Sequence, residues 1–124
     1  MIFQEGNLQM SATIKRFGGE VILKYDNGCF RSFSGMTVCE FDGRNVKRFG
    51  GTVLYKIDGD LVRDFYNTIL YRFDGECFRT FSHEIILRLR GNQICNFTGQ
   101  TLYTIDGYLD YSETMALLAI LAIG

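Results

Sequence analysis

Basic side chains recur in two series along this sequence, each at intervals of sixteen residues. Together the two series hold nine of the thirteen lysines and arginines. They are Lys15, Arg31, Lys47, Arg63 and Arg79, and then Lys24, Lys56, Arg72 and Arg88, with Glu40 and Cys95 interrupting the pattern. Arranged as rings on a repeating fold, these cations could hold phosphate or carboxylate groups through charge-assisted hydrogen bonds. In the alternative interpretation, their stems cover strand faces and their charges meet aspartates at the surface.

Aspartates recur at one further repeat position: Asp26, Asp42, Asp58, Asp74 and Asp106. A calcium site needs several oxygens that converge on one point. A hydrolase of the two-carboxylate type needs paired acids at a defined separation. One aspartate per repeat predicts neither, so we interpret these residues as turn formers. Two carboxylates that converge in a pocket would support the hydrolase alternative.

The remaining reactive residues form no recognisable catalytic or metal-binding set. The cysteines Cys29, Cys39, Cys77 and Cys95 have separations typical of neither a zinc site nor a dense disulfide framework, which favours free thiols in a reducing cytoplasm. His83 is the only histidine and stands where other repeats have Gly or Asn, so a turn residue is expected rather than a general base. We therefore predict no enzymatic activity, no metal and no cofactor.

The elements that position these side chains come from an internal repeat. A phenylalanine recurs every sixteen residues without a slip, at Phe17, Phe33, Phe49, Phe65, Phe81 and Phe97. The first half of each repeat, as in TVLYKIDG from Thr52, is rich in β-branched and aromatic residues and in four repeats ends in Asp-Gly. This pattern predicts a strand followed by a tight turn. The second half ends at the phenylalanine and then a residue that tolerates positive φ, namely Gly, Asn67 or His83.

The order of the half-repeats predicts a closed assembly. The array begins with a second half (Thr13–Gly19) and ends with a first half (Gln100–Gly107), and pairing between these two would hide both sheet edges. We predict one all-β domain over residues 1–124, with repeats over 13–107, as a pseudo-symmetric closed array of about six short antiparallel hairpins. A β-solenoid is the alternative. The phenylalanine column is expected in the core, and an exposed stacking platform is the alternative.

The last residues, 112–123, predict a short apolar helix. Ser112 is a suitable N-cap, and from Met115 onward the segment is apolar all round. Such a helix must enter the core, close one mouth of the ring, or contact another subunit. In the last case Met115, Leu117, Leu118 and Leu121 would form an oligomer interface. The apolar run is too short to span a bilayer.

The repeat core also resembles that of a known family. The segments LYKIDG, LYRFDG and LYTIDG, with Val-Arg or Phe-Arg following in three of the six repeats, resemble the bacterial β-flower proteins, a small uncharacterised group in which hairpins radiate about a pseudo-symmetry axis. The ending IDGYLDYSETMALLAIL is similar to the ending of that family, which leads into a short helix. The resemblance covers about Thr13 to Leu121. It implies the fold, with five-fold or four-fold arrangements in the family against six phenylalanine positions here, and it implies no catalytic residue.

Charge and composition limit the classes of partner. Thirteen basic and fourteen acidic residues give a net charge of -1, so no nucleic-acid partner is expected from the overall field. The N-terminal residues lack the pattern of a secretory signal, which favours a cytoplasmic protein. We predict a non-enzymatic binding or scaffold module of unknown partner, with self-association through the C-terminal segment as one option. The alternative is an anion or small-ligand binder that uses the repeated lysines and arginines.

Overall fold

The computed structural model describes residues 11–123, except for the side chain of Ile123. Residues 1–10, on which the expectation about a secretory signal chiefly depends, lie outside this range. The elements are β1 (Ser11–Arg16), β2 (Val21–Asp26), β3 (Cys29–Ser32), β4 (Thr37–Phe41), β5 (Asn45–Arg48), β6 (Val53–Asp58), β7 (Leu61–Arg63), β8 (Ile69–Phe73), β9 (Cys77–Thr80), β10 (Ile85–Arg90), β11 (Gln93–Cys95), β12 (Thr101–Gly107) and α1 (Tyr111–Ile123).

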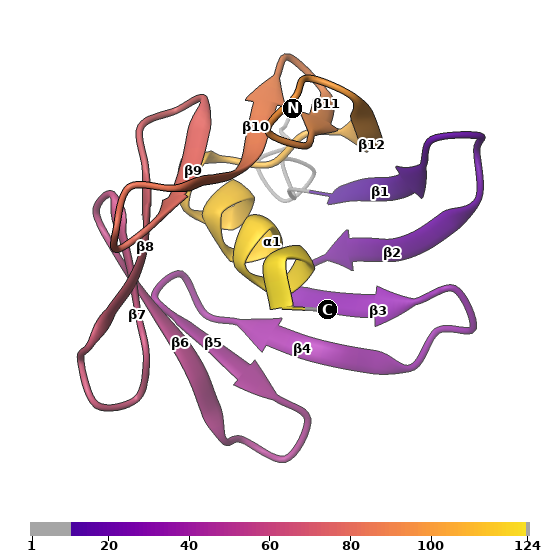
Figure 1. The fold of residues 1–124 in the computed structure, drawn as a ribbon. Helices are drawn as coiled ribbons and strands as arrows, with labels where there is room; N and C mark the ends of the chain where they lie inside the picture. Colours follow the sequence, from indigo (N-terminus) through magenta and orange to yellow (C-terminus); the bar gives the residue numbers. More distant parts are fainter. Residues whose placement is uncertain (1–10, 124) are drawn as a thin grey trace, which may run out of the picture.

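The twelve strands form one closed barrel around α1 (Figure 1). Every strand pairs antiparallel with its neighbours in sequence, and β1 pairs with β12 in the register Ile14↔Ile105. The predicted closure between the first and last half-repeats is therefore confirmed, and the solenoid alternative is wrong. Closure leaves no free sheet edge among the described strands, which removes the usual route to edge-to-edge aggregation.

Each phenylalanine lies at the tip of a hairpin, at one end of the barrel that we call the Phe end. In the hairpin of β3 and β4, the amide of Gly35 donates to the carbonyl of Ser32, and Gly35 has φ of 94°. This is a three-residue loop whose last residue is left-handed. Asn67 and His83 occupy the same place with φ of 69° and 73°, which confirms the turn roles predicted for both.

The opposite end, which we call the Asp-Gly end, is less regular than the repeat suggests. Asn27 and Gly28 both have positive φ, as a two-residue hairpin turn requires, whereas at Asp-Gly pairs only the glycine does. The last pair, Asp106-Gly107, forms no turn, because β12 continues through it and pairs with β1. The prediction of a tight turn is wrong at this position.

The core is lined by three other columns of the repeat. One column, on the second strand of each repeat, is fully buried throughout: Ile14, Phe30, Val46, Val62, Phe78 and Ile94. Leu23 and Tyr25 represent the two inward positions on the first strand. Between the strands of every Phe-end hairpin a β-bulge adds one residue, such as Leu54, which packs against the core from the side.

The expected core position of the phenylalanine column is wrong. All six rings are exposed, from 59% at Phe65 to 74% at Phe17 and Phe33. The physical reason is local. Each phenylalanine occupies the first position of the loop, beyond the last inward-facing residue of its strand, so its side chain leaves the barrel wall at the tip.

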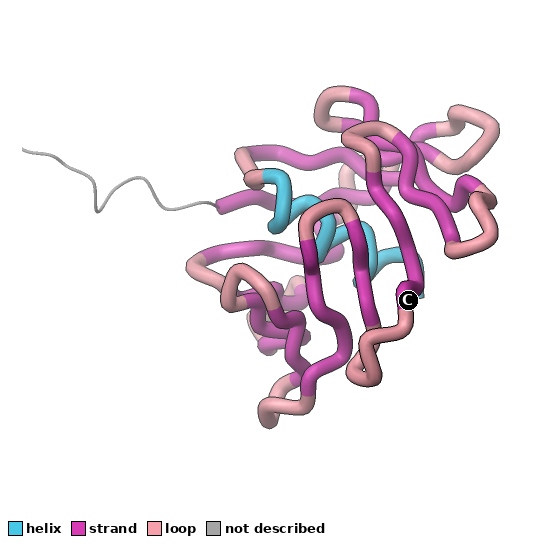
Figure 2. Tube along the Cα trace, turned by 90° about the vertical axis from the view of Figure 1, so that its left-hand side faces the viewer, coloured by secondary structure: helices cyan, strands magenta, loops and turns pink. Residues whose placement is uncertain are grey.

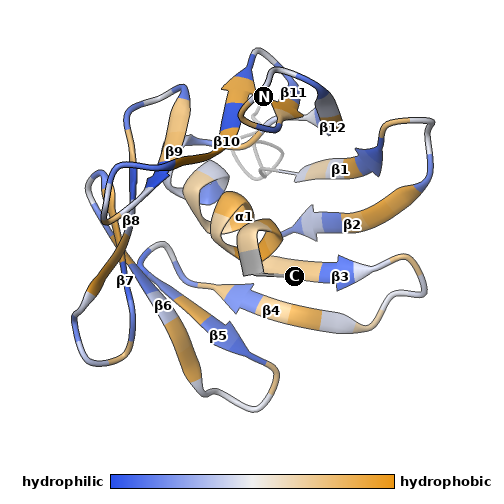
Figure 3. Ribbon diagram, viewed as in Figure 1, coloured by the Kyte–Doolittle hydropathy of each residue, from blue (hydrophilic) through white to orange (hydrophobic). Residues whose placement is uncertain are grey.

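Helix α1 fills the interior of the barrel (Figure 2). It begins at the Asp-Gly end, and Asp110 rather than Ser112 caps it, because the Asp110 carboxylate accepts the Glu113 amide at 2.8 Å while Glu113 accepts the Asp110 amide at 2.9 Å. The helix is pale to orange on the hydropathy scale over most of its length, whereas the strands alternate between polar and apolar residues (Figure 3). The predicted apolar C-terminal helix is confirmed, and it lies in the core.

Three residues expected at an oligomer interface are therefore inside the single chain. Met115, Leu117 and Leu118 have no exposed surface, because the barrel wall surrounds the helix on all sides at their level. Leu121 lies in the last turn and is partly buried against the core. The interface role is wrong for the first three side chains. Over residues 11–123, α1 is the sole helix, and it is too short to cross a membrane.

Candidate functional site: a basic belt and an aromatic rim

The repeated basic residues lie on the outer surface of the barrel. Strand alternation places them there, as in β2, where Lys24 is exposed between the buried Leu23 and Tyr25. The sequence suggested two rings. The register instead pairs the two series directly across neighbouring strands, so that they form a single belt. We call the nine residues Lys15, Lys24, Arg31, Lys47, Lys56, Arg63, Arg72, Arg79 and Arg88 the basic belt.

Like charges face one another in this belt. The cross-strand partners are Lys24↔Arg31, Lys56↔Arg63 and Arg72↔Arg79. From β5 to β10, six consecutive strands each contribute one cation to the belt. Directly opposed like charges destabilise an antiparallel pair. The arrangement is therefore electrostatically unfavourable for the isolated barrel.

Aspartates at the Asp-Gly end neutralise part of the belt. Three ion pairs join belt residues to repeat aspartates: Lys15 to Asp106 at 3.5 Å, Lys47 to Asp42 at 3.5 Å, and Arg63 to Asp58 at 3.4 Å. The alternative interpretation of the basic series is thus confirmed for three of its members. Within residues 11–123, the other six belt residues form no salt bridge.

The belt is convex, because α1 and the inward columns fill the inside of the barrel. The concave ring that a small anion would need is absent from the described residues. Two surface depressions include belt residues. One contains Lys24 and Asp26, and the other contains Arg88, His83 and Phe97. The Arg88 Nε atom is buried and has no hydrogen-bond partner in the described part of the chain.

The six phenylalanines surround the belt at the Phe end, and we call them the phenylalanine rim. In five hairpins the ring follows a belt residue by two positions, as Phe17 follows Lys15 and Phe33 follows Arg31. At a rise of about 3.3 Å per residue, the rim lies about 7 Å beyond the belt along each strand. Lys56 Nζ lies 6.0 Å from the centre of the Phe65 ring, which links the two features directly.

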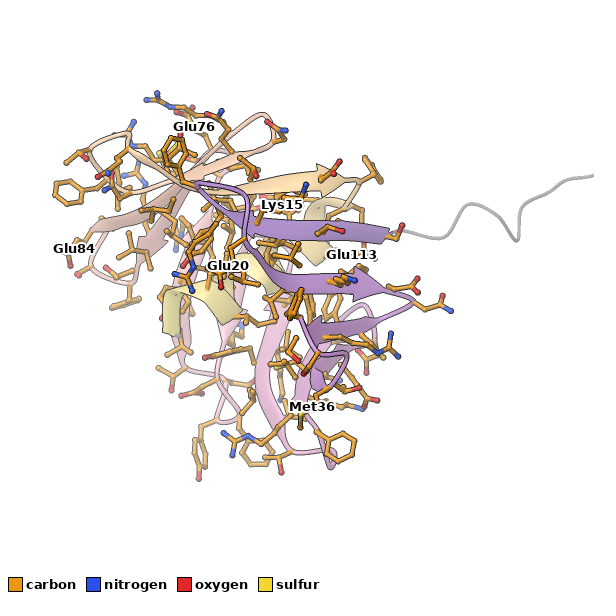
Figure 4. All side chains as sticks on the ribbon, turned by 90° about the vertical axis from the view of Figure 1, so that its right-hand side faces the viewer. Lys15, Glu20, Met36, Glu76, Glu84 and Glu113 are labelled. Atoms are coloured by element: carbon orange, nitrogen blue, oxygen red, sulfur yellow. The ribbon has the colours of Figure 1, made fainter. Side chains whose placement is uncertain are left out.

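Further apolar and charged residues accompany the rim. Met36 is 71% exposed on the Phe33 hairpin, and Tyr66 stacks edge-on against Phe65 with ring centres 5.4 Å apart. Figure 4 draws the described side chains as sticks and labels Met36 on the hairpin of β3 and β4, and Lys15 on β1. Arg16 precedes Phe17 and pairs with Glu20 at 3.3 Å. The rim thus combines exposed apolar side chains with a basic surface directly behind them.

The Asp-Gly end is acidic. Nine of the fourteen acidic residues lie there, on the turns and at the start of α1: Asp26, Asp42, Asp58, Asp60, Asp74, Glu76, Asp106, Asp110 and Glu113. The belt lies between the two ends, since Lys24 is two residues from Asp26 and Arg31 is two residues from Phe33, and three further acidic residues lie at the Phe-end loops: Glu20, Asp64 and Glu84. A net charge of -1 therefore conceals an acidic Asp-Gly end and a basic belt around the middle of the barrel.

One cleft at the acidic end brings carboxylates together, but they serve structural bonds. The cleft has a volume of about 310 Å³, and its lining includes Tyr25, Asp42, Asp110 and Glu113. Asp110 and Glu113 cap the helix, and Glu113 also accepts the Tyr25 hydroxyl at 2.7 Å. The backbone amide of Asn45 is the main cause that lowers the pKa of Asp42 to about 2, the opposite of what a general acid needs. The cleft gives no support to the hydrolase alternative.

The cysteines and histidine form no second site in the described residues. All four cysteines are free thiols, and burial raises the pKa of Cys39, which disfavours the reactive thiolate. His83 is exposed at its turn. No group of three or more His, Cys, Asp or Glu residues within 11–123 is placed to hold a metal ion.

Comparison with protein-family models, with curated proteins and with solved structures finds no match to this chain. The site therefore has to be interpreted from its own geometry. Sequence reasoning found the basic series but placed the phenylalanines inside. A signal for the rim was present, since each phenylalanine directly precedes a turn, as in Arg-Phe-Gly-Gly at Phe17 and Phe49.

Proposed function

We propose that this protein is a non-enzymatic binding module whose basic belt binds an extended anionic surface. The observation that carries the proposal is the direct opposition of like charges in Lys24↔Arg31, Lys56↔Arg63 and Arg72↔Arg79, of which only Arg63 has an aspartate partner among the described residues. Opposed cations weaken an isolated sheet. Bound anionic groups would neutralise each pair and remove the repulsion, so the same arrangement that is unfavourable alone becomes favourable in a complex.

The shape of the belt favours a broad partner over a small ligand. The cations lie on a convex outer wall, and the barrel interior is occupied by α1. A single phosphate or carboxylate on such a wall meets few donors at once. A surface that carries many anionic groups meets several cations of neighbouring strands simultaneously, and its affinity rises with the number engaged.

The other functional options receive less support. Burial of Met115, Leu117 and Leu118 removes the side chains that were to carry self-association. The resemblance to β-flower proteins adds an expectation about fold and none about activity. The four free thiols favour a reducing compartment, and on this basis we propose a cytoplasmic location.

A matched pair of arginine variants tests the proposed function. Arg72→Gln removes an exposed belt cation, and Arg44→Gln removes an exposed cation beside the Asp42 turn. Thermal unfolding with sodium polyphosphate should show stabilisation of the unmodified protein that fades as salt rises. Arg72→Gln should reduce this stabilisation, and Arg44→Gln should leave it unchanged.

The variants also separate repulsion from binding. Without polyphosphate, Arg72→Gln should unfold at a slightly higher temperature than the unmodified protein, because Arg79 loses its like-charged partner. Equal behaviour of the two variants with polyphosphate, or no stabilisation of the unmodified protein by it, contradicts the proposed function.

A further inference from the structure

We propose that the phenylalanine rim inserts into the surface of an anionic lipid bilayer while the basic belt lies against the lipid headgroups. This inference rests on the proposed function, because it names the extended anionic surface that the belt binds. It requires three things of the structure. The aromatic side chains must be exposed and not needed for the fold. The cations must lie at the depth of the lipid headgroups when the rings are inserted, and other classes of partner must fit the surface less well.

Neither the core nor the turn explains why phenylalanine occupies the rim position. The rings of Phe17, Phe33 and Phe49 are 73–74% exposed, so they contribute little to the packing of the barrel. The first position of such a loop accepts most residues and does not favour an aromatic one. An apolar ring is nevertheless present at all six tips. Repeated exposure of large apolar side chains is typical of an interaction surface.

The spacing between rim and belt fits the depth of a bilayer interface. Apolar groups of interfacial proteins reach about 5–10 Å into the boundary between headgroups and acyl chains. The rim lies about 7 Å beyond the belt along the strands. With the rings at that depth, belt side chains such as Lys15 and Arg31 reach the plane of the lipid phosphates, where each cation is attracted by the negative surface.

The polarity of the whole barrel supports the same orientation. Helix α1 starts at the Asp-Gly end, and in Figure 2 it runs towards the side opposite the start of β1. Its last turn, with Ile120 and Leu121 partly exposed, adds apolar surface at the Phe end. In this orientation the nine acidic residues of the Asp-Gly end face away from an anionic membrane, whereas three acidic residues lie at the Phe end, of which Glu20 is paired with Arg16.

Two other partners match the rim less well. Proteins that bind single-stranded nucleic acid place aromatic rings successively along one basic groove. Here each ring stands on a separate hairpin around a circumference. A second copy that docked rim to rim would cover the rings but would supply no anionic groups to the basic belt, because each belt lies about 7 Å behind its rim.

An intrinsic fluorophore tests the insertion directly. The chain has no tryptophan, so Phe33→Trp introduces a single indole at the rim. Tyr108→Trp is the matched control, because Tyr108 is 63% exposed and follows Gly107 at the Asp-Gly end. With vesicles of mixed phosphatidylserine and phosphatidylcholine, Phe33→Trp should show a blue-shifted emission and Tyr108→Trp should not. Pure phosphatidylcholine should shift neither.

A second variant measures the contribution of the rim to affinity. The triple variant Phe17→Ser, Phe33→Ser, Phe49→Ser should sediment with the mixed vesicles at least about 100-fold more weakly, since burial of one aromatic ring contributes about tenfold or more. Its stabilisation by polyphosphate should equal that of the unmodified protein, because the belt is intact. Its thermal unfolding curve should match that of the unmodified protein, because the three substituted side chains are exposed.

The outcomes separate the two proposals. Polyphosphate binding without vesicle binding overturns the bilayer inference and leaves the proposed function standing, and absence of both overturns both. Vesicle binding with no blue shift of Phe33→Trp, or with equal affinity of the triple variant, shows that the rim stays in water and overturns the inference. Tighter binding to an oligothymidine than to vesicles favours nucleic acid instead. A mass by light scattering that falls in the triple variant favours a second copy.

Discussion

Tyr25 of β2 donates a hydrogen bond of 2.7 Å to Glu113 of α1, and both residues are buried. The other carboxylate oxygen of Glu113 accepts the amide of Asp110, so one side chain caps the helix and attaches it to the barrel wall. Burial, together with the bond to Glu113, raises the pKa of Tyr25. The contact joins residues that are 88 positions apart and fixes where the helix enters the barrel.

Replacing Tyr25 with Phe should lower the free energy of unfolding by about 1.5–3 kcal/mol, because the buried carboxylate of Glu113 loses its hydroxyl donor. Urea unfolding at neutral pH measures the change. Tyr108→Phe is the control, since Tyr108 is exposed and should change stability by less than about 0.5 kcal/mol. The double variant Tyr25→Phe, Glu113→Gln should cost less than the sum of the two single changes. Additive costs would show that the two side chains do not act as a pair.

Phe30 and Phe49 have the same side chain in opposite environments. Phe30 is completely buried, whereas Phe49 is 73% exposed at the rim. We expect Phe30→Ala to lower stability by about 3–5 kcal/mol and Phe49→Ala to change it by less than about 0.5 kcal/mol. Chemical unfolding of the two variants side by side tests the division between core and rim. A large loss in Phe49→Ala would place the rim in the core after all.

Gly107 is required where the barrel closes. A Cβ at this position would lie 2.5 Å from the carbonyl oxygen of Ser11 and 2.8 Å from Ala12 Cα, and φ is +121°. Gly18 has a similar φ of +116° but open space around it, so Gly18→Ala should cost only the backbone strain of about 1–3 kcal/mol. Gly107→Ala should cost clearly more in thermal unfolding, because β1 must move away from β12. Equal losses would mean that the closure tolerates the shift.

Asp42 should make stability depend on acid pH. Its carboxylate accepts the amides of Asn45 at 2.7 Å and Arg44 at 2.9 Å, and these bonds lower its pKa to about 2 in the folded state. The unfolded value is about 3.9. The contribution is therefore fully present above about pH 4 and is lost as the pH falls towards 2. Asp42 is partly exposed, so solvent screening limits the effect to about 1 kcal/mol.

Thermal unfolding of the unmodified protein and of Asp42→Asn over this pH range measures the effect. The two proteins should differ at pH 7 and should converge as the pH approaches 2. Asp58→Asn serves as the comparison for the contribution of an ion pair, because Asp58 forms an ion pair with Arg63. A difference between the unmodified protein and Asp42→Asn that is constant down to pH 2 would show that the charge of Asp42 does not stabilise the fold.

The architecture could be predicted from the sequence because the repeat makes one local pattern appear six times. Strand alternation, residues suited to positive φ such as Asn67 and His83, and the split first and last halves all point to a closed barrel. The apolar helix had to be buried for energetic reasons alone. Local chemistry and the global fold agree at each of these points.

The site could be predicted only in part, because it depends on register and on depth within a hairpin. Periodicity identified Lys56 and Arg63 as belt residues but could not show that they face one another, since that follows from the pairing of β6 with β7. Regular spacing also indicated a common environment for Phe33 and its equivalents without saying which environment. The side chain lies outside because its position is one step past the end of β3. The bond between Tyr25 and Glu113 joins the second strand to the helix and has no local sequence signal.

The helix inside the barrel also limits how many repeats the chain can have. Twelve strands about 4.8 Å apart give a wall roughly 18 Å across, which leaves room for side chains around a helix about 10–12 Å wide. Loss of one sixteen-residue repeat would narrow the wall to roughly 15 Å by the same reasoning, and Leu117 and Leu118 would no longer fit. A gain of one repeat would open voids around the same residues. Duplication or deletion of a repeat would therefore require side chains of a different size in the thirteen residues of α1. The helix thus restricts the number of repeats in the barrel.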